Sequence, residues 1–307
     1  MLAKFIDLQV NGHGGIDLLS AETIEDVRKV SRSLYKHQLV GYLPTIITSS
    51  IAAATRALKL IEEVRQNPES GEALILGTHL EGPFISMQKR GVHPPEFIVA
   101  PDLEHMKSLL GAGLIKQVTL APELPGAIDL IKYLVSEGVL VSLGHTNASM
   151  AEAEAGFKAG AKTVTHLFNA MPKPPLTGLA QVAIEREDVV IQIIIDQVHV
   201  SNELLVQTLP KIMNRFIVVN DAVAAAGLGD GVFPFGAMEV KVANGQARRV
   251  DGTLAGGVAT FADSIKIMQK LEISSDVIQA SLTTRPAALI GVNYLDLLEQ
   301  SKKLSKN

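Results

Sequence analysis

The chain has no cysteine and no tryptophan, and aromatic residues make up only 4% of its 307 residues. The absence of cysteine excludes disulfide bonds, thiolate nucleophiles, iron–sulfur clusters and thiolate zinc sites. Any transition-metal site must therefore be built from His, Asp and Glu side chains.

The sequence also lacks a long hydrophobic run. Its best candidate, VVIQIIIDQVHV, is interrupted by Gln192 and Asp196 and is too short to cross a bilayer. The N-terminal segment reaches Asp7 after only a few apolar residues, which is not the pattern of a signal peptide. We therefore expect a soluble cytoplasmic protein that does not act on a membrane.

Charge of one sign is not in large excess. The 28 basic and 32 acidic residues give a formal net charge of −4, which argues against binding to nucleic acid through bulk charge. Hydrophobic residues make up 47% of the chain, and the mean hydropathy is +0.24. The chain can therefore bury a large core, and extensive disorder is not expected.

Short apolar runs alternate with amphipathic, helix-like stretches along the whole chain, and several of these runs are typical of strands buried on both faces. Eight such strands, each followed by a helix or loop, predict a (β/α)₈ barrel that forms a single domain over residues 1–307. The alternative, an open sheet that binds a dinucleotide, requires a GxGxxG motif, which the chain lacks. The runs are Phe5–Val10, Tyr42–Ile47, Leu74–Leu80, Gln117–Leu120, Val139–Leu143, Thr163–His166, Val189–Ile195 and Phe216–Val219.

One segment interrupts this alternation after the eighth strand. Residues Ala237–Gly252 contain two β-like stretches on either side of Asn244-Gly245, a dipeptide typical of tight hairpin turns. We expect a β-hairpin that leaves the barrel at this point.

Polar residues gather at the ends of the apolar runs. Glu81 closes the third run, His145 and His166 follow the fifth and sixth, His199 follows the seventh, and Asp221 closes the eighth. A barrel places all these ends on one face, which is the face where such enzymes carry their active sites.

These residue types favour metal-dependent hydrolysis. One carboxylate and two imidazoles supply three protein ligands, the number found in catalytic rather than structural zinc sites. A water molecule can complete such a site, where its pKa falls toward neutrality. Asp221 is suited to act as the base for this water and then as the acid for the leaving group.

Motifs along the chain resemble those of the N-acetylglucosamine-6-phosphate deacetylases, a family of the amidohydrolase superfamily. The resemblance extends from about Phe5 to Val292. It rests on FIDLQVNGHGG, HLEGPFI, KRGVHP, LGHTNAS, THLFNAMP, DQVHV, NDAVAAAG and DGTLAGG.

The resemblance assigns a role to each candidate residue. It implies that Glu81, His145 and His166 bind one divalent metal ion, zinc, and that Asp221 is the catalytic acid–base. It also implies that a second metal is not held, because neutral amides occupy the Gln-x-Asn positions where many amidohydrolases have His-x-His. The residues expected to contact the sugar are His93, Asn169, Ala170, His199, Gln9 and Asn11.

The chain departs from the family pattern in three ways. We expect the small β domain that normally flanks the barrel in the family to be absent, and we expect a homodimer that covers the corresponding surface. The loop after NAMP, KPPLTGLA, has Lys173 but lacks the arginine that binds the substrate phosphate in the family. Asn220 replaces a threonine and Gln197 replaces a glycine.

We therefore predict a metal-dependent hydrolase that deacetylates N-acetylglucosamine 6-phosphate to glucosamine 6-phosphate and acetate. Because the arginine is missing, deacetylation of an unphosphorylated or different N-acetyl amino sugar is an alternative. A non-catalytic sugar-binding or regulatory barrel is a third possibility, from another class. The partner in each case is a small sugar.

Overall fold

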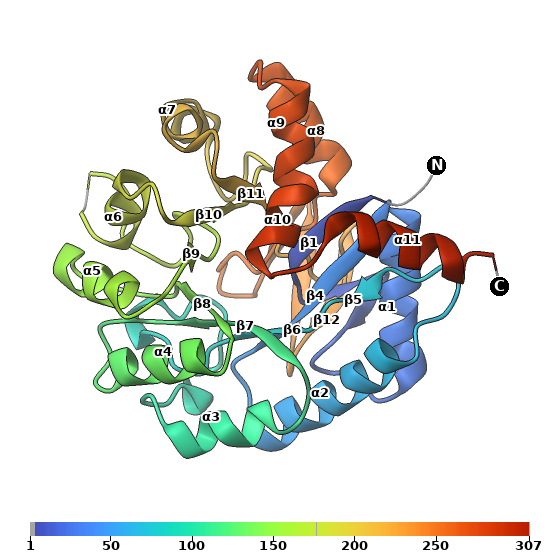
Figure 1. Cartoon of the computed structure of the whole chain (residues 1–307), viewed down its shortest axis with the longest axis horizontal. Helices are drawn as coiled ribbons and strands as arrows, with labels where there is room; N and C mark the ends of the chain where they lie inside the picture. Colours follow the sequence, from blue (N-terminus) through green and yellow to red (C-terminus); the bar gives the residue numbers. More distant parts are fainter. Residues whose placement is uncertain (1–3, 176, 307) are drawn as a thin grey trace.

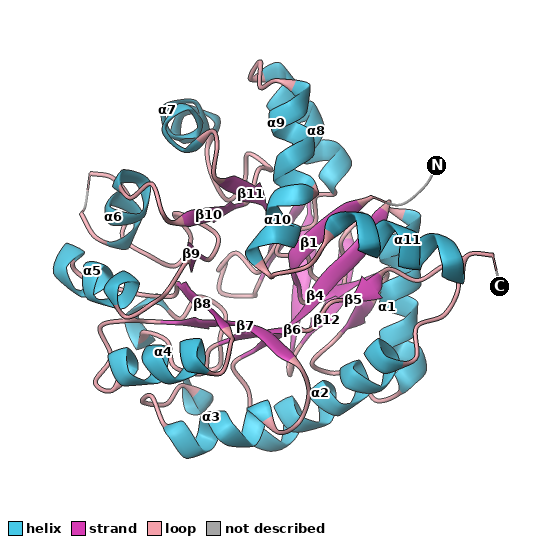
Figure 2. Cartoon of the chain, in the orientation of Figure 1, coloured by secondary structure: helices cyan, strands magenta, loops and turns pink. Residues whose placement is uncertain are grey.

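A parallel β-sheet curls into a barrel in the computed structural model, which describes residues 4–175 and 177–306. Its strands follow the order β1–β4–β6–β7–β8–β9–β10–β11, and helices surround it (Figures 1 and 2). The predicted (β/α)₈ architecture is thereby confirmed. The strands are β1 (Phe5–Val10), β4 (Leu39–Ile47), β5 (Leu74–Ile75), β6 (Thr78–Glu81), β7 (Ile115–Leu120), β8 (Leu140–Leu143), β9 (Thr163–Val164), β10 (Val190–Ile193) and β11 (Phe216–Val218).

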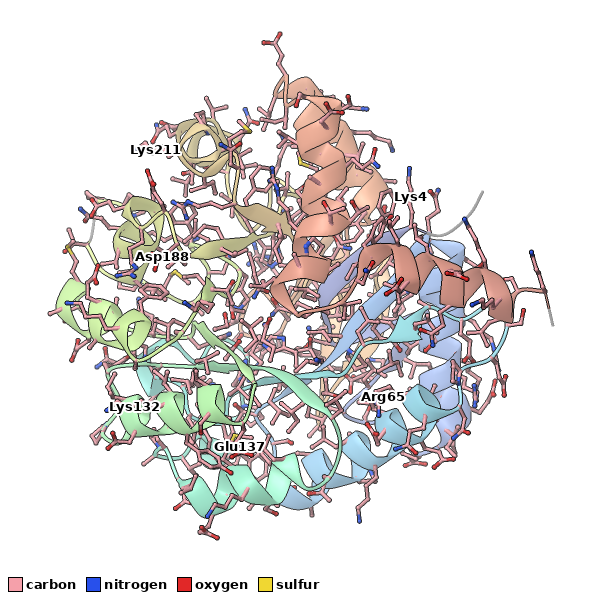
Figure 3. The ribbon with its side chains drawn as sticks, in the orientation of Figure 1. Lys4, Arg65, Lys132, Glu137, Asp188 and Lys211 are labelled. Atoms are coloured by element: carbon pink, nitrogen blue, oxygen red, sulfur yellow. The ribbon has the colours of Figure 1, made fainter. Side chains whose placement is uncertain are left out.

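The helices lie outside the strands and carry charge on their outer faces. Figure 3 labels Arg65, Lys132 and Lys211 on helices at the periphery of the molecule. The helices are α1 (Ile24–Lys36), α2 (Ile51–Gln66), α3 (Leu103–Leu110), α4 (Ala127–Ser136), α5 (Met150–Lys158), α6 (Leu179–Glu185), α7 (Asn202–Ile212), α8 (Phe261–Lys270), α9 (Ser275–Leu282), α10 (Thr284–Leu289) and α11 (Tyr294–Leu304). Two 3₁₀ turns, Met87–Lys89 and Pro95–Phe97, flank the loop that carries His93.

Helix α1 shows how the sequence encodes these outer elements. Thr23 caps its N-terminus, because its side chain accepts from the backbone N–H of Asp26 while the Asp26 carboxylate accepts from that of Thr23. Val27, Val30 and Leu34 recur on one face and are buried. This apolar face packs against the barrel, and the opposite face remains in solvent.

The barrel closes between β11 and β1 through residues just beyond the last strand. Ala222 bridges to Val10, its N–H donates to the Gln9 carbonyl at 3.2 Å, and its own carbonyl accepts from Asn11 at 2.7 Å. Because Asp221 directly precedes Ala222, this seam places Asp221 beside the C-terminal end of β1.

The predicted third strand, Leu74–Leu80, is divided into two strands in the structure. β5 and β6 both pair with β4, and the chain turns between them at Gly77, where φ is +129°. A Cβ at Gly77 would lie 2.3 Å from Lys116 Cγ, so only glycine fits both the backbone conformation and the space. The apolar run alone does not show this break.

Beyond the barrel, a three-stranded antiparallel sheet follows β11. It consists of β12 (Gly231–Phe235), β13 (Met238–Ala243) and β14 (Gln246–Arg248), and the turn between the last two contains Asn244-Gly245. A small pair, β2 (Gly12–His13) and β3 (Ile16–Asp17), follows β1. Within residues 4–175 and 177–306, no helix is both long and apolar enough to cross a membrane.

The backbone break at Gly77 leads to a stability prediction. We expect Gly77→Ala to lower the free energy of unfolding by roughly 1–3 kcal/mol, because alanine is strained at this φ and meets the Lys116 side chain. Gly111→Ala is the matched control, because its nearest non-neighbouring atoms would lie 3.5 Å or more away. Denaturant unfolding of the two variants measures the difference, and equal stability would contradict the assignment.

Candidate metal-binding active site

The carboxyl ends of the strands deliver the predicted side chains to one cavity of about 210 Å³. Glu81 is the last residue of β6, and His93 lies on the long loop after the same strand. The other histidines and Asp221 lie on loops that follow other strands. The structure thus brings together eight of the ten predicted site residues as cavity-lining residues: Glu81, His93, His145, His166, Asn169, Ala170, His199 and Asp221.

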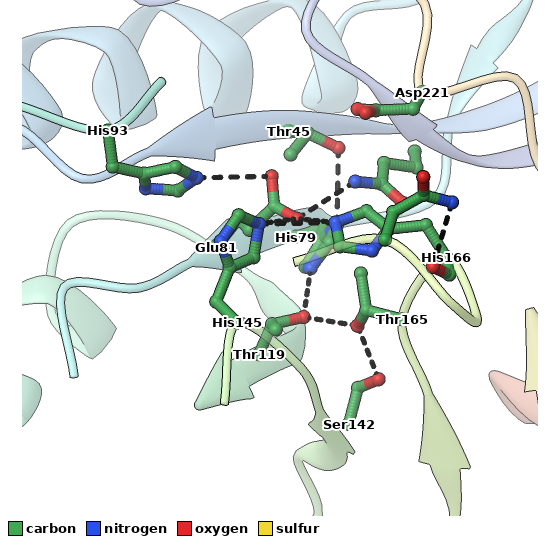
Figure 4. Close-up of polar contacts among 12 residues, drawn as sticks. Thr45, His79, Glu81, His93, Thr119, Ser142, His145, Thr165, His166 and Asp221 are labelled. Atoms are coloured by element: carbon green, nitrogen blue, oxygen red, sulfur yellow. Dashed lines mark hydrogen bonds and ion pairs between the residues drawn. The ribbon is translucent and has the colours of Figure 1, made fainter. Parts of the chain in front are cut away.

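Three of these side chains converge on each other (Figure 4). Nε2 of His166 lies 2.9 Å from Oε1 of Glu81 and 3.1 Å from Nε2 of His145, and Nε2 of His145 lies 3.3 Å from the same carboxylate oxygen. Ligands about 2.0–2.1 Å from a tetrahedral zinc ion lie roughly 3.3 Å from one another. The separations therefore fit a single ion bound by Glu81, His145 and His166.

The hydrogen bonding of His145 supports this ligand role. Its Nδ1 lies 2.9 Å from the carbonyl oxygen of Lys89, which can only accept, so Nδ1 carries the hydrogen. Nε2 therefore presents its lone pair toward Glu81 and His166. A backbone carbonyl that fixes the ring in this way is the usual second partner of a metal-ligating histidine.

His93 also lies close to this group but has the opposite tautomer. Glu81, His93 and His145 each offer a ligand atom within 4.8 Å of the others, so these three buried residues could hold a metal ion. However, Nδ1 of His93 lies 2.8 Å from the Thr48 hydroxyl, which can donate or accept, and 3.3 Å from the Thr48 backbone N–H, which can only donate. The backbone donor favours Nδ1 as the acceptor, with the hydrogen on Nε2. This tautomer makes Nε2 a donor, and it favours His166 as the third ligand.

The electrostatics of the cluster centre on a buried carboxylate. Burial alone would raise the pKa of Glu81, but the hydrogen bonds and charges of His145 and His166 hold that pKa well below its usual range. For His166, burial opposes the charged form, while Glu81 and the charge of Asp221 raise its pKa. The carboxylate is thus ionised and available to a cation.

Asp221 faces the cluster from the seam of the barrel. Burial and the negative charge of Glu81 raise the pKa of Asp221 to about 6, against the opposing effects of His166, His199 and Asn11. The amide of Asn11 donates to its Oδ1 at 2.7 Å. A carboxylate whose pKa is close to neutrality is well matched to accept and return a proton.

Gln9 and Asn11 are not among the residues that line the cavity. Their side-chain amides lie one layer behind it: Gln9 donates to Glu81 Oε1 at 3.0 Å, and Asn11 donates to Asp221. This geometry favours orientation of the two carboxylates, while their predicted contact with the sugar stays a prediction.

Left-handed backbone conformations gather around the cavity. Such φ values are uncommon outside glycine and cost about 1–3 kcal/mol each, so they persist where the surrounding structure imposes them. They are typical of functional sites. The non-glycine residues with positive φ on these loops are His145, His166, Phe168, Ala170, Gln197 and Asp221.

Sequence reasoning missed one wall of the cavity, which comes from the segment after β11. Phe235 from β12 and Thr253, Leu254 and Gly256 all line it. The DGTLAGG motif was a signal for this wall, because it belongs to the resemblance without holding a chemical group. The segment after β11 therefore contributes to the site at both ends of the predicted excursion.

A parallel barrel with a buried carboxylate–histidine cluster and an opposing aspartate at its carboxyl-end face defines the amidohydrolase type of metal-dependent enzyme. No family model matches the chain. Individual relatives of known activity, however, identify a family within this class.

Several of the similar curated proteins are N-acetylglucosamine-6-phosphate deacetylases. The one from Caenorhabditis elegans is 36% identical over 94% of this chain and 73% of its own length, and the one from Bacillus subtilis is 34% identical over 94% and 74%. A crystal structure of that enzyme from Pasteurella multocida superposes with a TM-score of 0.88 at 32% identity, covering 94% of this chain and 76% of that chain. The chain belongs to the N-acetylglucosamine-6-phosphate deacetylase family, and it spans about three quarters of the length of these relatives.

The contact between Asn11 and Asp221 leads to a pH prediction. We expect Asn11→Ala to raise the pKa of Asp221 above about 6, because the ionised carboxylate loses a hydrogen-bond donor. The base works when ionised, so the acid limb of kcat/KM should move to higher pH. A pH profile measured with metal content checked in parallel tests this, and an unmoved acid limb would contradict it.

Proposed function

We propose that this chain removes the acetyl group from N-acetylglucosamine 6-phosphate, releasing glucosamine 6-phosphate and acetate. The observation that carries the proposal is the position of Asp221 across one cavity from the cluster of Glu81, His145 and His166. Membership in the deacetylase family supports the substrate class.

Glu81, His145 and His166 would hold the metal ion, and we propose zinc, because two imidazoles with one carboxylate form a typical catalytic zinc set. When bound, the ion would supply an activated water molecule and polarise the acetamide carbonyl. Gln9 keeps the Glu81 carboxylate oriented through its amide donor.

Asp221 and His93 would perform the remaining chemistry. Asp221 accepts a proton as water attacks the acetamide carbon, and it gives that proton to the amine nitrogen as the C–N bond breaks. His93 carries hydrogen on Nε2 and can donate it as a hydrogen bond to the carbonyl oxygen where negative charge develops. Asn169, Ala170 and His199 line the same cavity and would orient the sugar.

The assembled site weighs against the non-catalytic barrel considered from the sequence. A sugar-binding protein needs neither a buried cluster of metal-ligand type nor an opposing carboxylate with a raised pKa. An unphosphorylated or different N-acetyl amino sugar remains the second candidate substrate, because the loop that begins at Lys173 lacks arginine.

A comparison of two variants tests the function. Wild-type protein should release acetate from N-acetylglucosamine 6-phosphate and contain about one divalent ion per chain. Asp221→Asn should lose about 10²–10⁴-fold in kcat yet keep its metal, because the amide cannot accept the proton. His166→Asn should lose metal and turnover together, as mass spectrometry and an acetate assay will measure.

The opposite results would overturn these roles. Full turnover by Asp221→Asn removes Asp221 from the mechanism, and full metal content in His166→Asn removes the ligand assignment. If wild-type protein with metal bound releases no acetate from any N-acetyl amino sugar, the proposed function itself is wrong.

The loop without arginine predicts weaker selectivity for the phosphate. An arginine holds phosphate through paired hydrogen bonds, whereas Lys173 offers a single mobile charge. Loss of one charge-assisted pair changes specificity by about ten- to a hundredfold. The kcat/KM ratio for phosphorylated over unphosphorylated N-acetylglucosamine should therefore be smaller than in an arginine-bearing family member assayed alongside. An equal ratio would show that another group binds the phosphate.

We also propose that the chain forms a homodimer. Leu228, just before β12, and Val232, on β12, expose 53% and 61% of their surface, and Val250, just after β14, is fully exposed. Exposed apolar side chains in this part of the chain favour burial against a second copy. Light scattering at micromolar concentration should give twice the chain mass, and a monomer would contradict this. Cytoplasmic location and the absence of nucleic-acid binding stay predictions.

A further inference from the structure

Asp196 lies on the loop after β10 and makes three hydrogen bonds within its own turn. Its Oδ1 accepts from the backbone N–H groups of Val198 and His199, both at 2.9 Å. Its Oδ2 lies 2.7 Å from Nδ1 of His199. The side chains of Asp196 and His199 are each only 6% exposed. One carboxylate therefore fixes both the backbone and the ring of His199.

This contact determines which nitrogen of His199 carries hydrogen. Burial alone would raise the pKa of Asp196, but the hydrogen bond and charge of His199 and the two backbone donors lower it. An ionised carboxylate only accepts hydrogen bonds, so Nδ1 of His199 is the donor. Nε2 is then the ring atom left for the cavity, which His199 lines together with Asn169 and Asp221.

The arrangement differs from that of the neighbouring histidines. Nδ1 of His145, the ring nitrogen that points away from the cluster, donates to a backbone carbonyl. Nδ1 of His93 accepts from a backbone N–H. A backbone carbonyl holds His145, and both the backbone N–H and the hydroxyl of Thr48 contact His93, whereas an ionised carboxylate holds His199. The tautomer of His199 can therefore be reversed by changing one side chain without altering the backbone.

We propose that Asp196 is a positioning residue of this site: it holds His199 in the Nδ1–H tautomer, so that Nε2 accepts a hydrogen bond from a hydroxyl group of the sugar substrate. This inference rests on the proposed function, because a hydroxyl-bearing sugar is the occupant that Nε2 meets. Asp196 acts only through His199 and takes no part in the proton transfers of Asp221.

Asp196→Asn tests the proposal with little change in shape. Asparagine keeps an oxygen for the backbone N–H groups of Val198 and His199 but presents an NH₂ group to Nδ1. The ring then accepts at Nδ1, and its hydrogen moves to Nε2, where it opposes the hydroxyl donor. We expect KM to rise about tenfold or more while kcat changes less than about threefold, because the lost contact is made in both ground state and transition state.

Two comparisons separate positioning from a structural effect. In a His199→Gln background, Asp196→Asn should cause no further rise in KM, because the imidazole through which Asp196 affects the substrate is already absent. Asp129→Asn is the matched control, since this aspartate is exposed on α4 and, among the described residues, pairs with Lys132 alone. It should leave KM unchanged. Additive effects in the double variant, or an unchanged KM in Asp196→Asn, would overturn the proposal.

Nitrogen-15 spectra of the histidine side chains give a readout that does not need turnover. With His199 assigned by its absence in His199→Gln, wild-type protein should show Nδ1–H and Asp196→Asn should show Nε2–H. The same tautomer in both proteins would overturn the proposal. If wild-type protein hydrolyses no N-acetyl amino sugar, the proposed function fails while these spectra still decide whether Asp196 sets the tautomer.

Discussion

The buried carboxylate of Glu81 is the constraint on which the site depends. A charged oxygen that is almost fully removed from water is strongly destabilising unless donors or a cation compensate it. Gln9 from β1 and the imidazoles that follow β8 and β9 supply this compensation. The ends of several strands must therefore meet at one point, and the closed barrel is the architecture that brings them there.

The seam between β11 and β1 places the second carboxylate. Asp221 adopts a left-handed φ of +50° directly before Ala222 bridges to β1. The segment after the excursion then returns so closely that a Cβ at Gly257 would lie 2.1 Å from the carbonyl oxygen of Asn220. The barrel therefore closes at a point where Asp221 must adopt a strained turn. The same point leaves room only for the glycine pair of DGTLAGG on the returning segment.

Much of this arrangement follows from sequence patterns, because strand-like apolar runs and the polar residues at their ends are local signals. The contacts behind the cavity are not local. Gln9 reaches Glu81 across 72 residues and Asn11 reaches Asp221 across 210, and no periodicity reports which amide meets which carboxylate. The break at Gly77 escaped for a related reason, since it depends on the side chain of Lys116 from a neighbouring strand.

Three of the four imidazoles in the cavity differ in what their Nδ1 atom contacts, whereas Nδ1 of His166 has no hydrogen-bond partner among the described residues. The Lys89 carbonyl accepts from Nδ1 of His145, so Nε2 of that ring keeps its lone pair. The Thr48 N–H donates to Nδ1 of His93, so Nε2 of that ring carries the hydrogen. The carboxylate of Asp196 fixes His199. The two former rings sit 4.4 Å apart between centroids, so residue type and position alone do not separate a ligand from a donor. Hydrogen bonds made outside the cavity therefore separate the roles proposed for His145, His93 and His199, which are chemically identical side chains.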